Sequence, residues 1–250
     1  MIVVSTPKDF VNSWQNQYHV LARKIAGLLG SFGGTLVEIG CGKGQLTVPL
    51  AKLLSKWRIE AVDSFAYPYS ADYKSLVSVV SAAGLKSRIR PVVSDYSKWL
   101  KSQQDSTFDS VITSEFLPEL NHEEMRYFLS ECHRIVRPGG NSTHSFLSPI
   151  PKNRWQKLLI EADSDPRWTK TPPKQWFSPK PQITAEELRR AGFKAIQTMR
   201  VKSNLRVKAE AAKFLLKDWD VRGSFWNAHK ASLQRHGLEI PDWVILKASR

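Results

Sequence analysis

The stretch VEIGCGKGQLT, residues 37–47, places three glycines within five positions directly after a short apolar run. Glycine adopts positive φ angles at little steric cost and lets the backbone approach a ligand closely. A strand that turns into a helix through such a segment is typical of open α/β sheets, where the helix N-terminus presents unpaired N–H groups. The segment therefore predicts a ligand-binding corner after the first strand of a sheet.

The spacing of these glycines disfavours two well-known phosphate-binding loops. A P-loop needs serine or threonine after its lysine, whereas Lys43 is followed by Gly44. A dinucleotide-binding fingerprint needs a glycine three residues after Gly42, and Gln45 occupies that position. The corner is therefore expected to hold a different kind of ligand.

Strand and helix patterns alternate on both sides of the corner, which indicates βαβ units and a mainly parallel sheet. A leading helix is predicted to start at Thr6, with Pro7 at its first position, and to end at the glycines of 30–34. The strands expected are 35–39, 58–63, 88–93, 108–114, 141–147, 194–201 and 242–248. The further helices expected are 43–56, 70–84, 97–102, 122–136, 184–193, 204–219 and 224–237. The segment 137–140 is expected to be a turn.

The chain has 250 residues, of which 42% are hydrophobic, enough for one large α/β domain. It shows no apolar run long enough to span a membrane and no secretory signal pattern, so a cytoplasmic protein is expected. Cys41 and Cys132 are too few for a disulfide framework or a cysteine-rich zinc site. We expect both thiols to be reduced and no metal to be bound.

The chain is expected to form one domain with three parts. Residues 1–149 form the leading helix and the ligand-binding core, 150–183 a proline- and tryptophan-rich lid, and 184–250 the completion of the sheet with further lid helices. Residues 151–250 carry a net charge of +11, against +3 for the rest. Such a bias suits an acidic substrate, nucleic acid or an anionic surface, or is simply a solvated basic face.

The motif Glu-x-Gly-x-Gly-x-Gly at 38–44 resembles motif I of class I S-adenosylmethionine-dependent methyltransferases. The resemblance continues in order through IEAVD (59–63), VVSDYS (92–97), FDSVITSEFLPEL (108–120), FLSECHRIVRPGG (128–140) and ITAEELRRAGFKAIQTMRV (183–201). It implies a Rossmann-like, seven-stranded, mostly parallel sheet with helices on both faces. The last strand, expected at 242–248, would be antiparallel, and helical insertions would form a lid.

The resemblance also implies the cofactor, S-adenosyl-L-methionine, with S-adenosyl-L-homocysteine as product. Asp63 would accept hydrogen bonds from the two ribose hydroxyls, and Asp95 would meet the adenine amino group unless it only caps a helix. Cys41 would contribute its backbone alone. The residues expected to contact the cofactor are Glu38, Gly40, Cys41, Gly42, Gly44, Asp63, Ser64, Asp95, Tyr96, Ser114 and Tyr18.

Methyl transfer needs a base only when the accepting atom arrives protonated. Glu115, one residue after the expected strand end at Ser114, and His144 are the candidate catalytic residues. The alternative for Glu115 is a loop carboxylate without a catalytic role, and the alternative for His144 is a hydrogen-bonded residue within a strand. His122 follows Asn121, which with Glu124 predicts a capping box, so an exposed first-turn residue is expected there. Tyr18 lies on the apolar face of the leading helix, so core packing is its alternative.

The expected substrate is a small acidic or aromatic molecule. Excess Lys and Arg favour an acidic one, and the lid supplies aromatic side chains for a ring or a cation: Trp155, Trp168, Trp176, Phe177, Trp219 and Trp226. RNA or protein methylation through the basic C-terminal surface is the alternative, and a non-catalytic cofactor-binding subunit is a third. The residues 113–116 lack the Asn/Asp-Pro-Pro-Tyr/Phe pattern of base amino methylation. The accepting atom and the oligomeric state are left open.

Overall fold

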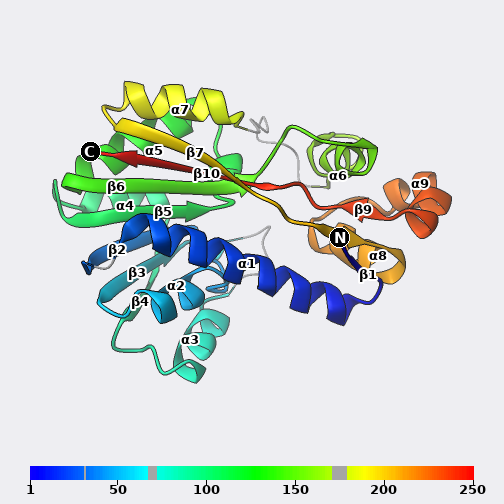
Figure 1. Ribbon diagram of the computed structural model, residues 1–250, viewed down its shortest axis with the longest axis horizontal. Helices are drawn as coiled ribbons and strands as arrows, with labels where there is room; N and C mark the ends of the chain where they lie inside the picture. Colours follow the sequence, from blue (N-terminus) through cyan, green and yellow to red (C-terminus); the bar gives the residue numbers. More distant parts are fainter. Residues whose placement is uncertain (31, 67–71, 171–178) are drawn as a thin grey trace.

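A seven-stranded sheet forms the centre of the computed structural model, which describes residues 1–30, 32–66, 72–170 and 179–250 (Figure 1). Its strand order is β4-β3-β2-β5-β6-β10-β7, and only β10 runs antiparallel to its neighbours. The strands are β2 (Gly34–Ile39), β3 (Trp57–Asp63), β4 (Ile89–Val93), β5 (Phe108–Ser114), β6 (Val136–Leu147), β7 (Lys194–Val201) and β10 (Trp243–Ser249). The predicted fold class, including the antiparallel last strand, is confirmed.

Helices cover both faces of this sheet, and for that reason its central strands are apolar on both sides. Leu36 belongs to the cluster beneath one set of helices, and its neighbour Val37 belongs to the cluster beneath the other. The first set is α1 (Pro7–Leu29), α2 (Thr47–Leu53) and α3 (Tyr73–Ala82); the second is α4 (Tyr96–Ser102), α5 (His122–Ile135) and α7 (Pro181–Arg190). A short 3-10 turn, η1 (Leu117–Glu119), follows β5.

The sequence signals that predicted two helix starts are present in the structure. The Thr6 hydroxyl accepts a hydrogen bond from the Asp9 N–H at 3.2 Å, with Pro7 at the first position of α1. Asn121 and Glu124 form a reciprocal capping box at the start of α5. Both starts are therefore set by local side-chain to backbone hydrogen bonds.

A second, smaller unit lies beside the sheet, and we call it the cap (Figure 1). It consists of a three-stranded sheet, β1 (Ile2–Val4), β8 (Leu205–Val207) and β9 (Leu238–Glu239), with α6 (Arg154–Ser164), α8 (Ala209–Asp218) and α9 (Gly223–Arg235). These elements share an apolar cluster of their own. The helix α1 packs on α2 and β10 in the core and on α8 and β1 in the cap, so it joins the two units.

Two local predictions were wrong. The helix expected over 204–219 begins only at Ala209, because Leu205 to Val207 pair in parallel with Ile2 to Val4. Residues 2–4 were not predicted to form a strand at all. The expected turn at 137–140 lies inside β6, whose pairing with β5 shifts register after Phe108. In the first case, pairing with a distant segment outweighs local helix propensity.

Three chain segments pass between core and cap next to one another, and Asp242 links them. The carboxylate of Asp242 bonds to the ammonium group of Lys152 after β6 and accepts from the Ser203 N–H after β7 at 3.4 Å. Its backbone carbonyl accepts from the Ser148 N–H at 2.8 Å. Asp242 is only 6% exposed, whereas the side chain of Lys152 is about half exposed. The cap is thus tied to the end of the sheet.

The expected lid falls partly within the cap. Its first half forms α6, whereas Trp176 and Phe177 lie outside the described residues. Trp168, Trp219 and Trp226 pack against the cap's own apolar cluster. The division of the chain at 149 and 183 stays a prediction. Among the described residues, no helix has the length and apolarity that crossing a membrane requires.

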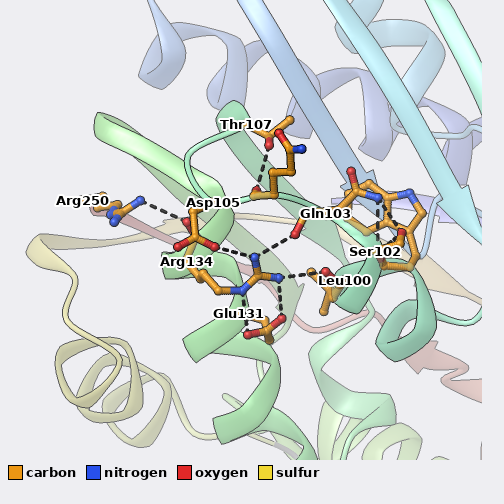
Figure 2. Close-up of polar contacts among 10 residues, drawn as sticks. Leu100, Ser102, Gln103, Asp105, Thr107, Glu131, Arg134 and Arg250 are labelled. Carbon is orange, nitrogen blue, oxygen red and sulfur yellow. Dashed lines mark hydrogen bonds and ion pairs between the residues drawn. The ribbon is translucent and has the colours of Figure 1, made fainter.

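At the other end of the sheet, where the central strands β5 and β6 begin, Arg134 holds several segments together (Figure 2). Its guanidinium donates to the carbonyls of Leu100 and Gln103, each at 2.8 Å, and to the carboxylates of Asp105 and Glu131. One side chain thereby joins the end of α4, the loop before β5 and the end of α5. Arginine suits this position because its planar fork offers five donors.

We expect Arg134→Ala to lower the free energy of unfolding by about 1–2 kcal/mol, because it leaves carbonyls and carboxylates without their donor. Urea denaturation measures the loss. Arg90→Ala is the matched control, since Arg90 is an exposed arginine with one ion pair to Glu60 at 3.4 Å, and its loss should change stability by under about 0.5 kcal/mol. Equal effects of the two substitutions would contradict the role given to Arg134.

Candidate active site

The glycine corner has the geometry that its sequence predicts. Gly40, Gly42 and Gly44 have φ angles of 77°, 50° and 80°, in the left-handed region that favours glycine. A Cβ added to Gly40 would lie 2.8 Å from the Phe116 ring, and one added to Gly44 would lie 2.7 Å from Leu76. A side chain at either position would therefore require both a strained backbone and displaced neighbours.

The corner is tied to the neighbouring strand by backbone and side-chain hydrogen bonds. The N–H groups of Gly40 and Cys41 both donate to the Val62 carbonyl, at 2.9 and 3.3 Å. The Asp63 carboxylate accepts from the Gly42 N–H at 2.9 Å through one oxygen and from the Phe65 N–H at 2.7 Å through the other. A carboxylate has about four acceptor positions, so both oxygens of Asp63 can accept a further bond from a ligand hydroxyl.

Glu38 lies beneath the corner and is only 1% exposed. Burial raises its pKa to about 8, with a further upward contribution from the Asp63 charge and an opposing one from Thr47. Its Oε2 has no hydrogen-bond partner among the described residues, and neither has the buried hydroxyl of Ser114. Buried polar atoms without partners are costly, so these two suit a ligand that donates hydrogen bonds or carries positive charge.

Glu115 follows the end of β5 in a left-handed conformation with φ of 56°, which is uncommon for a residue with a side chain. Its N–H donates to the Ser145 carbonyl at 2.8 Å, and its Oε1 accepts from the Leu147 N–H at 2.5 Å. These bonds to β6 hold the half-buried carboxyl at the carboxyl end of the sheet. Desolvation raises its pKa to about 8, and the nearby Asp163 carboxylate adds to the effect.

Tyr18 of α1 is brought to the same place. Its side chain is 7% exposed and lies beside Ser114, Glu115 and Glu38. Burial is the main cause that raises the pKa of Tyr18 well above the ordinary range, and the charges of Glu115 and Glu38 add to it. Tyr18 and Trp243 also meet Trp14, with ring centroids 5.5 to 5.8 Å apart. The alternative of core packing is therefore confirmed for Tyr18, and its contact with the cofactor stays a prediction.

Three other predicted cofactor contacts lie around the corner. Asp95 caps α4, its Oδ1 accepting from the N–H groups of Ser97 and Lys98, so the capping alternative is confirmed and an adenine contact stays a prediction. The ring of Tyr96 packs edge-on against Phe116, 5.3 Å away. Ser64 is exposed and follows Asp63 directly. Cys41 is buried, and burial raises the pKa of its thiol, so it stays protonated.

The structure does not bring His144 to the site. Its ring is fully buried in β6, with Nδ1 2.9 Å from the Thr113 hydroxyl and Nε2 2.8 Å from the Ser142 hydroxyl. Burial lowers its pKa to about 3, so the imidazole is neutral at physiological pH. With both nitrogens engaged, it matches the alternative of a hydrogen-bonded strand residue, and we assign it no catalytic role.

The contacts of His122 also lie away from the glycine corner. It begins α5, as the capping box predicted, and its Nε2 lies 3.0 Å from the Glu187 carboxylate on α7. Arg126 and Arg190 bond to the same carboxylate, which is 2% exposed. His122 is therefore part of an ion-pair cluster that joins two helices.

Asp163 and Asp218, both in the cap, were missed in the sequence. Asp163 is half-buried on α6, and burial raises its pKa to about 6, while its charge acts on Glu115. Asp218 ends α8. Burial raises the pKa of Asp218, and the charge of Lys43 in the glycine corner partly opposes that rise. The helical periodicity that places Asp163 with Gln156 and Leu159 was the available signal.

Replacing Glu38 tests the burial of its charge. A carboxyl whose pKa rises from 4.5 to about 8 on folding retains its proton in the folded state, so it reduces stability progressively as pH rises between those values. Glu38→Gln removes this loss. The Tm of Glu38→Gln minus that of the wild type should therefore become more positive between about pH 5 and about pH 8. A difference that is independent of pH would contradict the assignment.

Comparison with known proteins agrees with this geometry. Residues 36–140 match the family described as a methyltransferase domain. The chain is 30% identical over 129 residues to the mitochondrial ubiquinone biosynthesis O-methyltransferase of Rattus norvegicus, covering 51% of this chain and 34% of the rat protein. It is 29% identical over 161 residues to the ubiquinone biosynthesis O-methyltransferase of Caulobacter vibrioides, covering 63% and 56%. The chain thus spans between one third and just over half of the length of these relatives.

Solved structures show the same fold at low identity. A SAM-dependent methyltransferase from Archaeoglobus fulgidus superposes with a TM-score of 0.61 at 16% identity over 94% of both chains. A phosphoethanolamine N-methyltransferase 2 from Haemonchus contortus, in complex with S-adenosyl-L-methionine, gives 0.61 at 15% identity over 94% of this chain and 52% of the other. Residues 36–140 thus resemble a methyltransferase domain, and the strand order and glycine corner agree with the fold that these solved methyltransferases share.

Proposed function

We propose that this chain transfers the methyl group of S-adenosylmethionine to a hydroxyl oxygen of a small, uncharged molecule. The observation that carries the proposal is the Glu115 carboxyl, held at the strand end with a pKa raised to about 8 and placed beside Tyr18 and Ser114. Two relatives that the chain resembles are named O-methyltransferases, which supports oxygen as the accepting atom.

The residues at the corner fit the cofactor. Glu38, with an unpartnered buried oxygen, suits a ligand ammonium group, and Asp63 has acceptor positions left for the ribose hydroxyls. The positive φ angles of Gly40, Gly42 and Gly44 let the backbone make the tight turn that such a ligand-binding corner needs. When bound, the cofactor supplies a methyl carbon already activated by a sulfonium, so the protein needs only to align the acceptor and manage its proton.

Glu115 is placed to take the proton of an acceptor hydroxyl. A general base works best with a pKa near the working pH, and a carboxylate with a raised pKa is a stronger base than an ordinary one. The Leu147 N–H holds Oε1 and thereby fixes the orientation of the carboxyl group. Tyr18, on α1, is positioned to orient the acceptor oxygen with its own hydroxyl.

The charges near Glu115 favour an uncharged acceptor over the acidic one that composition suggested. The nearest titratable groups from β2 and α6 are the carboxyls of Glu38 and Asp163. Glu38 keeps its proton at neutral pH, but Asp163, whose pKa is about 6, is ionised there and would repel an anionic acceptor. Trp14 and Trp219, whose ring centroids lie 6.3 Å apart where α1 meets the cap, offer apolar contact for a ring instead.

One feature of the cap favours RNA as an alternative acceptor. A surface groove between α6 and α9 is lined by Arg154, Lys157 and His229 together with Glu161, and Trp155 next to it stacks on His236 with a centroid distance of 4.6 Å. Basic and aromatic side chains together suit single-stranded RNA. Methyl transfer to RNA that falls steeply with salt would support this alternative; salt-insensitive transfer to a small molecule would exclude it.

Asp63→Ala should weaken binding of S-adenosylmethionine about 10- to 100-fold, because it removes an acceptor of ribose hydroxyls and releases the Gly42 N–H. Isothermal calorimetry measures the affinity. Arg134→Ala, at the opposite edge of the sheet, is the control and should bind the cofactor as the wild type does. Unchanged affinity in Asp63→Ala would place the cofactor elsewhere.

Glu115→Gln should abolish the rise of kcat with pH while leaving cofactor affinity within about two-fold, since glutamine can still accept from the Leu147 N–H but cannot take a proton. In the wild type, kcat should rise through about pH 8 as the carboxyl ionises. Turnover of an acceptor found by screening with labelled donor gives the profile. A Glu115→Gln profile that still rises near pH 8 would assign the base elsewhere.

A further inference from the structure

Two consecutive residues at the end of β6 are held from opposite sides. The Leu147 N–H donates to the side chain of Glu115, which follows β5, at 2.5 Å. The next N–H along the chain, that of Ser148, donates to the backbone carbonyl of Asp242, just before β10, at 2.8 Å. The strand β6 lies between β5 and β10 in the sheet, and its successive N–H groups point to alternate sides. The strand end that orients the Glu115 carboxyl is therefore also fixed to Asp242.

The side chain of Asp242 holds this residue in place. Its buried carboxylate forms an ion pair with the ammonium group of Lys152, in the segment that follows β6. It also accepts a hydrogen bond from the Ser203 N–H, in the segment that follows β7, at 3.4 Å. A buried carboxylate is costly without such partners, so the backbone of Asp242 is held where its side chain can reach both of them.

Lys152 is held in place as well. Its N–H donates to Oε1 of Gln156 in α6 at 2.8 Å, and Nε2 of the same Gln156 donates to the Ile240 carbonyl at 3.4 Å. Gln156 is itself buried. Because Ile240 lies two residues before Asp242, these bonds connect the segment after β6 to the segment before β10 a second time. The contacts of Asp242 are thus part of a larger network that includes a helix of the cap.

The residue after Asp242 extends the network to Tyr18. Trp243 pairs with Leu147 in the sheet and is fully buried, and its ring centroid lies 5.5 Å from that of Tyr18. Tyr18 in turn lies beside Glu115. A shift at the start of β10 would therefore change both the bond that Glu115 receives from β6 and the packing of the ring beside it.

We propose that Asp242 is a positioning residue for Glu115. Through its bonds to the segments after β6 and β7, it fixes the strand end from which the Leu147 N–H orients the carboxyl that takes the acceptor proton. Because those two segments lead into α6 and β8, the same residue links the orientation of the base to the position of the cap. The inference rests on the proposed function, because it takes Glu115 to be the base.

Loss of this positioning would shift the titration of Glu115 in a defined direction. A hydrogen bond to the ionised form favours that form, so the Leu147 N–H lowers the pKa of Glu115 against the larger effect of desolvation. If the end of β6 loosens, the bond weakens and the pKa rises. Removing the negative charge of Asp242 without any loosening would instead lower the pKa, because ionisation of Glu115 becomes easier. The direction of the shift therefore distinguishes positioning from charge.

Other titratable groups act on Glu115 from the elements packed around it. The charge of Asp163 in α6 raises its pKa. Tyr18 of α1 lies beside it, and Glu38 of β2 acts on Tyr18. Burial raises the pKa of both Tyr18 and Glu38, so both are protonated at neutral pH. None of these three residues is substituted in the test, so their contributions are common to all the proteins that are compared.

The test follows the ionisation of Glu115 directly and needs no acceptor. Protein labelled with ¹³C at the side-chain carboxyl carbon of glutamate is titrated by NMR, and the signal of Glu115 is the one that Glu115→Gln lacks. In the wild type this signal should titrate near pH 8. Asp242→Ala and Lys152→Met should both raise the midpoint by about half a pH unit or more, although they remove opposite charges.

Turnover gives a second measurement, with the acceptor found by screening with labelled donor. In both variants kcat at about pH 7 should fall about three-fold or more, since the ionised fraction of Glu115 falls by that factor for half a pH unit. The affinity for S-adenosylmethionine should stay within about two-fold of the wild type, because the glycine corner is unchanged.

Conservative variants and a matched control complete the set. Lys152→Arg keeps the ion pair and should keep the wild-type midpoint. Asp242→Asn keeps the size of the side chain and should give a smaller upward shift, which supplies the direction if Asp242→Ala does not fold. Lys170→Met is the control, because Lys170 is also half exposed and pairs with Asp220 after α8 at 3.3 Å; it should titrate as the wild type does.

Failure of this inference can be told apart from failure of the proposed function. A wild-type kcat that does not follow the ionisation of Glu115 would overturn the proposed function. A midpoint that neither Asp242→Ala nor Lys152→Met changes would overturn the inference alone. Opposite shifts in these two variants would also overturn it, since they indicate an effect of charge only. So would an equal shift in Lys170→Met, which indicates a general loosening of the protein.

Discussion

The site depends on the hydrogen bonds that fold the glycine corner back onto β3. The Val62 carbonyl accepts from Gly40 and Cys41, and the Asp63 carboxylate accepts from Gly42, so the backbone after β2 is held against the end of the next strand. Only glycine fits at Gly40, where positive φ and the Phe116 ring leave no room for a Cβ. With that corner in place, the parallel strands bring Glu38, Asp63 and Glu115 to one edge of the sheet.

Much of the core could be predicted from the sequence, because its elements are defined by local signals. Apolar runs mark strands such as β2 and β5, and Thr6 and Asn121 mark helix starts through their own hydrogen bonds. The β1 strand could not be predicted in this way. It is stabilised by pairing with residues about two hundred positions away, and nothing in residues 2–4 indicates that partner.

The same limit applies to the candidate site. The glycines, Asp63 and Glu115 were predicted because motifs of a known family mark them, and the structure places Tyr18 with Glu115. His144 and Asp163 show what such motifs cannot decide. Both are polar residues within regular elements, and only packing tells that His144 is enclosed by its own sheet whereas Asp163 is near enough to raise the pKa of Glu115.

Composition and the surroundings of Glu115 lead to different proposals for the acceptor, for a related reason. Net charge averages over the whole surface, and the excess of Lys and Arg in residues 151–250 lies largely on exposed side chains such as Lys157 and Arg167. The electrostatic surroundings of the candidate site are set instead by a few half-buried or buried groups, among them Glu38, Glu115 and Asp163. Charge interactions are strongest where water is excluded, so groups next to the site matter more to an acceptor than solvated cations on the surface do.

The most direct measurement is a crystal structure of the protein with S-adenosylhomocysteine bound. We expect the ligand to lie over the glycine corner, with both ribose hydroxyls within hydrogen-bond distance of the Asp63 carboxylate and the sulfur on the side of Ser114 and Glu115. A ligand bound away from the corner, or no ligand there at concentrations that saturate the protein in solution, would contradict the account.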